Sequence, residues 1–305
     1  MASFQDYLKL HFLVFLWGFT AILGKLITIP AMEMVFYRTI LAAVGMAFLL
    51  VVTQKRFRVD RIDAVRLMLT GSIVAIHWLT FFLSGRVSNP STSLVGFATC
   101  SLWTAIIEPL AKGRPIAKLE VGLGILVIIG LYVIFTTNFQ YPLGLVLGII
   151  SGLTIAIFAV INSQLVKRFD AYTITFYEMT GAAITLALFF PIYLNTWSDS
   201  GTPELVPTSL DWLWLAVLAF VCTVYAYAAS INLMKQLSVF TIQLTLNLEP
   251  VYGIVLALLV FREKELMDVG FYIGTAIIIG AVFLYPLMRR RTQSADRTQA
   301  SSPDQ

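Results

Sequence analysis

The chain has 305 residues, of which 58% are hydrophobic and only 12% are charged, and its formal net charge is +4. Soluble domains carry about 25% charged residues, so this composition is too apolar to form a soluble surface. It excludes an ordinary soluble enzyme, a disordered chain and a disulfide scaffold, and it indicates a membrane protein. The two cysteines, Cys100 and Cys222, lie inside apolar runs and predict no disulfide framework.

Apolar runs bounded by charged residues, proline or glycine predict ten transmembrane helices, because each has roughly the 20 residues that cross a bilayer. In chain order the runs are 9–27, 31–53, 64–85, 92–111, 117–136, 143–166, 172–194, 210–234, 239–261 and 266–288. The polar connection 195–209 contains two prolines and is expected to be an exposed loop. The tail 289–305 is polar and lacks apolar periodicity, so we expect it to be disordered.

The basic residues predict the orientation of these helices. If the N-terminus is cytoplasmic, sixteen of the 21 basic residues lie in inward loops and tails, and only Lys25, Arg86, Arg262 and Lys264 face outward. Because loops rich in Lys and Arg stay in the cytoplasm, we expect both termini to be cytoplasmic. The same loops explain the basic composition, so no nucleic-acid partner is expected. The expected location is the inner, cytoplasmic membrane of the cell, crossed many times.

The two halves of the chain repeat each other. Phe36-Tyr37-Arg38 aligns with Phe176-Tyr177-Glu178, and a constant shift of 150 residues aligns the three helices from 64 with those from 210. Gly18 likewise matches Gly152. Each half, 9–136 and 143–288, holds five helices, an odd number, so the second half must enter the membrane from the opposite face. Inverted repeats of this kind supply the two gates of an alternating-access carrier, with the substrate site near the midplane.

Three motifs stand out: Leu16-Trp17-Gly18, Phe36-Tyr37-Arg38, and the segment 244–284, which holds Glu249-Pro250 and a glycine-spaced last helix. They resemble the drug/metabolite transporter superfamily, specifically its ten-helix EamA-type members. The first half departs from the pattern, with Thr99-Cys100 in place of Glu249-Pro250 and Gly113 in place of Glu263. The resemblance implies export of a small metabolite, often an amino acid, through a central cavity lined chiefly by the first, third, fourth, sixth, eighth and ninth helices.

Polar and aromatic side chains deep in the apolar runs are the candidate substrate-binding residues. Gln243 and Asn247 are four residues apart and therefore share a face of one helix. Trp17, Trp78 and Tyr227 lie deep in three other helices, where aromatic rings can stack on a ligand. In each case the alternative is packing or hydrogen bonding between helices, and the same choice applies to the amides of Asn162 and Asn232.

Ionisable groups inside the membrane are the candidate coupling or gating residues, because each charge costs several kcal/mol unless it is paired or hydrated. Arg38 and Glu178 occupy matching positions, but inversion places them near opposite faces, so they are not expected to pair. Glu249 precedes Pro250, which frees the carbonyl of Leu246 and loosens the helix there. His77 can titrate near neutral pH. The alternative for all four is a structural, hydrogen-bonded group.

The sequence shows no nucleotide-binding loop, nucleophile motif or metal-ligand spacing. We therefore expect a secondary transporter that is not an enzyme and needs no cofactor. Its expected partners are a small-molecule substrate, the lipid bilayer and, if transport is ion-coupled, protons. Two alternatives remain. A passive facilitator or channel needs a continuous polar stripe, and a membrane-embedded enzyme needs acid, base or metal ligands clustered at one depth.

Overall fold

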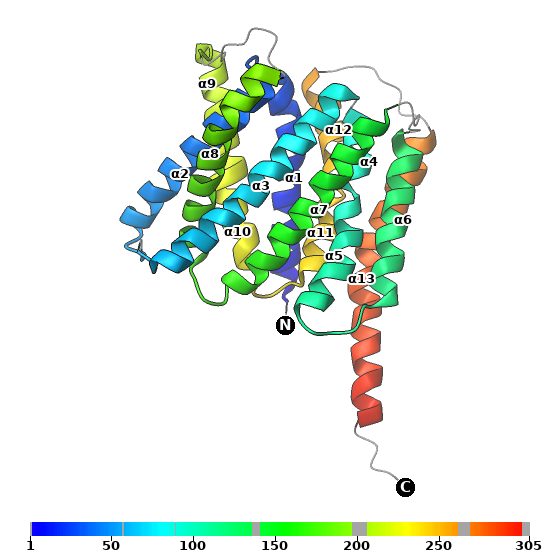
Figure 1. The fold of residues 1–305 in the computed structure, drawn as a ribbon. Helices are drawn as coiled ribbons and strands as arrows, with labels where there is room; N and C mark the ends of the chain where they lie inside the picture. The colour runs from blue at the N-terminus through cyan, green and yellow to red at the C-terminus, as the bar shows by residue number, and fades with distance from the viewer. Residues whose placement is uncertain are drawn as a thin grey trace.

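The computed structural model describes residues 2–56, 58–88, 90–135, 141–196, 206–261 and 269–300. All regular structure in these ranges is helical. The helices run up and down in one bundle, and the last of them projects beyond the bundle at the end where the N-terminus also lies (Figure 1). We call this end of the bundle the N-terminal end.

Seven spans among the described residues are long and apolar enough to cross a membrane, judged by length and composition. The all-helical fold is therefore confirmed, whereas the number of ten crossings remains a prediction. The uninterrupted helices are α1 (Phe4–Leu26), α2 (Ala31–Val52), α3 (Arg61–Val87), α6 (Lys118–Phe135), α7 (Pro142–Leu165), α8 (Ala171–Thr196) and α13 (Val269–Ala300).

Two helix ends differ clearly from the sequence expectation. Helix α1 starts five residues early, because Ser3 and Asp6 form a capping box that satisfies the free N–H groups of its first turn. Helix α13 continues to Ala300, so residues 289–300 are helical where we expected disorder. Extending an existing helix avoids the cost of nucleation, and this segment is rich in Arg, Gln and Ala, which favour helix. Residues 197–205 and 262–268, including Arg262, Glu263 and Lys264, lie outside the described residues.

Two of the expected helices are interrupted at positions related by the 150-residue shift. The run 92–111 divides at Ala98 into α4 (Pro90–Phe97) and α5 (Thr99–Ala111). The run 239–261 divides at Asn247-Leu248 into α11 (Val239–Leu246) and α12 (Glu249–Phe261). The second break lies where Pro250 predicted it. The first has no proline and was not predicted.

Glycines pack against both breaks in the same way. A Cβ on Gly152 of α7 would lie 2.6 Å from the hydroxyl of Thr99 and 2.8 Å from the carbonyl of Phe97. A Cβ on Gly18 of α1 would lie 3.0 Å from the carbonyl of Glu249. Gly18 matches Gly152 in the sequence, and Glu249 matches Thr99. Each half therefore places its first helix against the broken helix of the other half.

A third interruption lies in the run 210–234. It comprises α9 (Ser209–Ala216), a π-helical stretch η1 (Val217–Tyr225) and α10 (Ala226–Leu233). Within η1 the hydroxyl of Thr223 donates to the carbonyl of Leu218, five residues earlier, at 2.9 Å. Such π-helical stretches are frequent at functional sites. The sequence did not predict this one, because no proline or glycine marks it.

Candidate functional site

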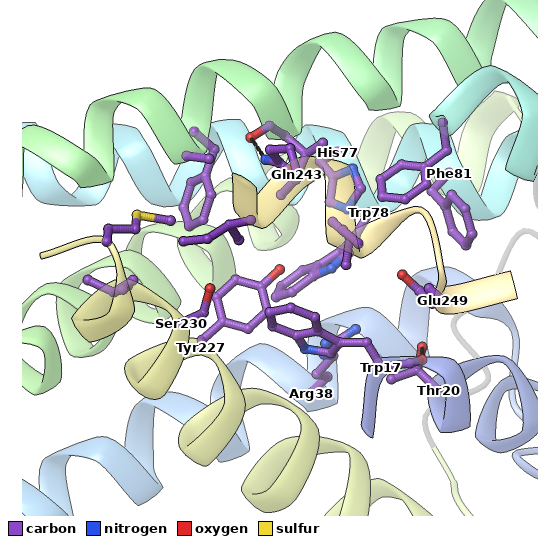
Figure 2. Close-up of a pocket in the computed structure, with 18 of the residues that line it drawn as sticks. Trp17, Thr20, Arg38, His77, Trp78, Phe81, Tyr227, Ser230, Gln243 and Glu249 are labelled. Carbon is purple, nitrogen blue, oxygen red and sulfur yellow. Dashed lines mark hydrogen bonds between the residues drawn. The ribbon is translucent and has the colours of Figure 1, made fainter. Parts of the chain in front are cut away.

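A cavity lies inside the bundle, lined by residues of α1, α2, α3, α4, α7, α10, α11 and α12 (Figure 2). The structure brings seven of the nine candidate residues to its wall: Trp17, Arg38, His77, Trp78, Tyr227, Gln243 and Glu249. Asn247 and Glu178 are not among the lining residues. These seven candidates come from six different helices, which are α1, α2, α3, α10, α11 and α12, and they meet only in the folded bundle.

Aromatic rings form a large part of the wall, since seven of its nineteen lining residues are Trp, Tyr or Phe. The ring of Tyr227 lies edge-on to Trp17 and to Trp78, with centroids 5.9 Å and 5.6 Å away. The ring of Phe158 lies 6.0 Å from it on another side. Edge-to-face pairs of this kind hold one another in place and present an apolar surface to a ligand.

Arg38 places a positive charge in this wall. Its side chain is buried, with 3% exposed, and its Nε donates to the hydroxyl of Thr223 at 2.8 Å. The guanidinium carbon lies 4.1 Å from the ring centroid of Trp78, a cation–π contact. Because the Thr223 hydroxyl donates to Leu218, its oxygen is available to accept from Arg38. The π-helical stretch therefore positions the cation.

Glu249 supplies a carboxyl group to the same cavity (Figure 2). It is the first residue of α12, where the free N–H groups of the first turn stabilise a negative charge. It is half-buried and close enough to Arg38 for the two to interact electrostatically. The wall thus carries one cation and one carboxyl group among aromatic rings.

Two further polar groups reach the wall. The Nδ1 atom of His77 lies 3.1 Å from the carbonyl and 2.8 Å from the hydroxyl of Ser151, so α7 holds this ring. Gln243 donates from Nε2 to the carbonyl of Ile155 at 3.2 Å, and its buried Oε1 has no partner among the described residues. That oxygen is an acceptor available to a ligand.

Asn247, expected on the cavity wall beside Gln243, is not among the lining residues. It lies at the end of α11 with helical backbone angles. Its side-chain amide donates to the carbonyl of Gln243, four residues earlier, at 3.0 Å and so caps the end of α11.

Glu178 also lies away from the cavity. Its side chain is completely buried, and Asn162 of α7 donates to it at 2.7 Å. The expectation that Arg38 and Glu178 do not pair agrees with this placement.

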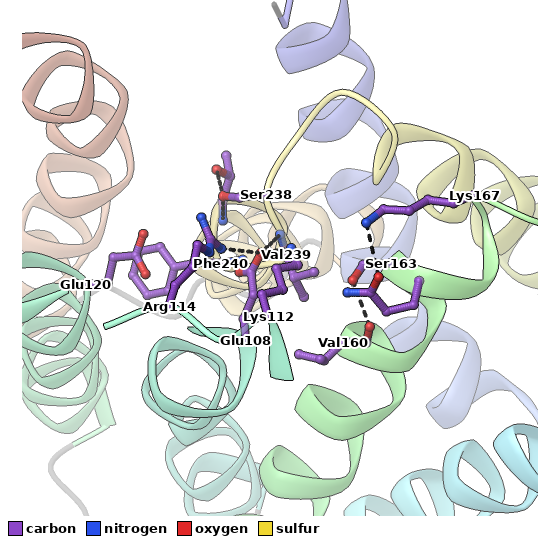
Figure 3. A network of polar contacts seen from close by, with 12 residues as sticks. Glu108, Lys112, Arg114, Glu120, Val160, Ser163, Lys167, Ser238, Val239 and Phe240 are labelled. Carbon is purple, nitrogen blue, oxygen red and sulfur yellow. Dashed lines mark hydrogen bonds and ion pairs between the residues drawn. The ribbon is translucent and has the colours of Figure 1, made fainter. Parts of the chain in front are cut away.

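Sequence reasoning gave no role to Glu108, whose carboxylate joins α5 to α11 at the N-terminal end (Figure 3). Glu108 is buried and accepts from the backbone N–H of Phe240 at 2.9 Å and of Val239 at 3.4 Å. Lys112 lies 2.5 Å and Arg114 3.8 Å from the same carboxylate. The spacing of Glu108 and Lys112 was the available signal, but the amide partners lie more than a hundred residues away in sequence. We call this group of contacts the Glu108 clamp.

Two copies of one family model, described as the EamA-like transporter family, match residues 7–136 and 142–286. The chain belongs to the EamA-like transporter family. The resemblance read from the sequence motifs is thereby confirmed.

A curated relative, an uncharacterized transporter of Archaeoglobus fulgidus, is 26% identical over 157 residues, which make up 52% of this chain and 53% of the relative. The chain thus matches about half the length of that relative. A solved crystal structure of a protein superposes on 95% of this EamA-family chain and 99% of its own, with a TM-score of 0.77 at 13% identity. At that identity the likeness shows the fold alone.

Proposed function

We propose that this protein is a secondary transporter that moves an amino acid or a related small metabolite across the cytoplasmic membrane by alternating access. The observation that carries the proposal is that Arg38 and Glu249 both line one aromatic cavity. The carboxylate of an amino acid suits the guanidinium of Arg38, and its ammonium group suits Glu249. An apolar side chain would contact the rings of Trp17, Trp78 and Tyr227.

The arrangement of the two halves supports alternating access. In each half the first helix packs, through a matching glycine, against the broken helix of the other half. Inverted repeats that exchange contacts in this way can build two gates around one site. The proposal includes ten crossings, with the N-terminal end in the cytoplasm as the basic loops favour. Export is the direction that the family resemblance implies.

Counterflow in proteoliposomes tests the proposal, with labelled L-phenylalanine as a zwitterionic aromatic probe. Vesicles preloaded with unlabelled L-phenylalanine should accumulate the label transiently, because a carrier must reorient with its substrate bound. 3-Phenylpropionate, which lacks the ammonium group, and phenethylamine, which lacks the carboxylate, should compete at least about tenfold more weakly, since each loses a charged hydrogen bond of about 1.5–3 kcal/mol.

The same measurement separates the alternatives. A passive channel would equilibrate the label without transient accumulation, and an embedded enzyme would convert the label into another compound. Equal competition by all three compounds would remove Arg38 and Glu249 as the groups that recognise the two charged ends.

A further inference from the structure

Two polar side chains of the cavity wall, His77 and Gln243, are anchored to neighbouring turns of α7. Nδ1 of His77 lies 3.1 Å from the carbonyl of Ser151. Nε2 of Gln243 donates to the carbonyl of Ile155 at 3.2 Å. Because Ser151 and Ile155 are four residues apart, their carbonyls lie on one face of α7, about 6 Å apart along the helix. The two side chains therefore lie close together on the wall, as Figure 2 also shows.

The two anchors determine which atoms remain free to bind a ligand. A backbone carbonyl only accepts hydrogen bonds, so Nδ1 of His77 and Nε2 of Gln243 are the donors. The hydroxyl of Ser151 fits this assignment, because it donates to the carbonyl of His77 at 3.2 Å and its oxygen lies 2.8 Å from Nδ1. The remaining polar atoms, Nε2 of His77 and Oε1 of Gln243, are then both acceptors.

Neither acceptor has a donor within the described part of the protein. Oε1 of Gln243 is buried without a hydrogen-bond partner there. Nε2 of His77 has no such partner either, and it is not fully buried. His77 is 7% exposed and Gln243 2%, so His77 offers the more accessible acceptor and Gln243 a more deeply buried one. Since both side chains line the cavity, a ligand can supply the donor that they lack.

The ring of His77 is neutral, which keeps Nε2 an acceptor. Among the described residues the ring forms no ion pair, and it interacts electrostatically with Arg38. A second positive charge beside Arg38 inside the membrane would be costly. Phe81 and Phe97 pack against the imidazole, with ring centroids 6.3 Å and 5.6 Å away, so its surroundings are largely apolar.

The two acceptors lie at a useful distance from the charged groups of the cavity. Gln243 precedes Glu249 by six residues, which is about 9 Å along the broken helix. An amino acid with an aromatic side chain has roughly this reach. A ligand held at its charged end by Arg38 and Glu249 can therefore place a polar atom of its ring beside the two acceptors.

We propose that His77 and Gln243 form a subsite that accepts a hydrogen bond from the side chain of the substrate. The transported amino acid then carries an aromatic ring with an N–H or O–H group, as an indole or a phenol does. This proposal rests on the proposed transport function and specifies the substrate class of the same cavity.

Selection follows from what happens when a ring without a donor binds. Such a ring displaces water from the cavity and leaves both acceptors buried and unpartnered, whereas a ring with a donor satisfies them. Sites that bind a substrate's N–H or O–H group in this way reject an analogue that lacks the group far more strongly than apolar pockets distinguish shapes.

Competition against labelled L-phenylalanine in the counterflow assay tests the selection with the unmodified protein. L-Tryptophan should compete at a concentration about tenfold or more below that of 3-benzothienyl-L-alanine, in which sulfur replaces the ring N–H group in a similar shape. L-Tyrosine and 4-fluoro-L-phenylalanine are the corresponding pair for an O–H group. A tenfold preference in either pair would support the proposal and identify the donor. Preferences below about threefold in both pairs, with counterflow intact, would overturn it and leave the proposed function standing.

Two variants assign the preference to these side chains. Gln243→Met removes the acceptor oxygen but fills the volume, and His77→Phe removes the ring nitrogens but keeps an aromatic ring. Each should reduce the preference to about threefold or less. Trp17→Ala changes the same wall without removing an acceptor, so it is the matched control and should keep the preference. A purely structural role would weaken both members of a pair equally, so an unchanged preference in both variants would contradict the proposal.

Thermal unfolding of the purified full chain measures binding without transport. At equal concentrations the donor-bearing member of the preferred pair should raise the unfolding midpoint more than its analogue, because only a ligand that binds the folded chain stabilises it. Such a difference without counterflow would count against the proposed function and still support the subsite. Equal midpoints within both pairs would overturn the subsite.

Discussion

At the scale of single residues, the two glutamates show how surroundings assign different tasks to the same side chain. Glu249 lies on the cavity wall within electrostatic reach of Arg38, so the two ends of a zwitterionic ligand can approach both groups. Glu178 lies outside the cavity with an amide as its described partner. From the sequence, both were predicted to be charged residues inside the membrane with a coupling or gating role. Their different surroundings could not be predicted, because these depend on which helices pack against each residue.

The cavity wall leads to a prediction for its tryptophans. Trp78→Ala removes the ring that contacts the guanidinium of Arg38 and the edge contact with Tyr227. These two contacts together contribute about 1.5–3 kcal/mol to holding the binding wall in the arrangement that receives the ligand. The concentration of L-phenylalanine that half-saturates counterflow should therefore rise about tenfold or more. Trp17→Ala and Gln243→Ala should weaken binding in the same direction. Trp212→Ala, at a ring that is 43% exposed and absent from the cavity wall, is the matched control. Equal transport by Trp78→Ala and the control would contradict the assignment.

Asn247→Ala should behave differently from these variants. Its amide caps α11, so the expected change is a loss of stability of about 1 kcal/mol with substrate affinity retained. Thermal unfolding measured beside counterflow distinguishes the two effects. The sequence placed Asn247 in the cavity beside Gln243. It did not predict the capping bond, because that bond depends on the helix ending at Asn247, near Pro250.

At the scale of elements, close backbone contacts determine where helices cross. Pro250 predicted the break in the run 239–261. The break at Ala98 in the run 92–111 depends on contacts with the other half of the chain. There Gly96 meets the backbone of Gly148 and Thr99 meets Gly152. The π-helical stretch was equally hidden, since the bond from Arg38 to Thr223 joins residues far apart in sequence. Local sequence patterns predicted the apolar helices well. They predicted an interruption of a helix only where a proline lies close to it.

The crossing of α3 and α8 gives a prediction about stability. A Cβ on Gly71 would overlap the carbonyl of Glu178, and one on Gly181 would overlap the carbonyl of Met68. Gly71→Ala should therefore destabilise the protein by about 1–3 kcal/mol through overpacking. Gly122→Ala, in an exposed part of α6 with nothing within 4 Å of its Cβ, should be neutral or slightly stabilising. Thermal unfolding in detergent compares the two, and equal midpoints would refute the close crossing.

At the scale of the whole molecule, the sequence predicts how the bundle is oriented in the membrane. The arrangement of the helices alone does not test this orientation. Reporter fusions check it. Fusions at Ser294 and near Gln54 should report the cytoplasm, because the basic residues gather in those loops, and a fusion near Ser200 should report the outside. A cytoplasmic signal near Ser200 would contradict both the ten crossings and the inversion of the second half.

The Glu108 clamp has a consequence for the resting carrier. An alternating-access carrier made of two identical inverted halves would have two symmetry-related states of equal energy and would spend half its idle time in each. Position 258, which matches 108 in the second half, holds leucine, so the sequence does not repeat at that position the carboxylate that fastens α5 to α11. A charged hydrogen bond of about 1.5–3 kcal/mol corresponds to a population ratio of about ten- to a hundredfold. Under the proposed alternating access, this bond favours the state whose N-terminal end is shut and whose cavity opens to the other side.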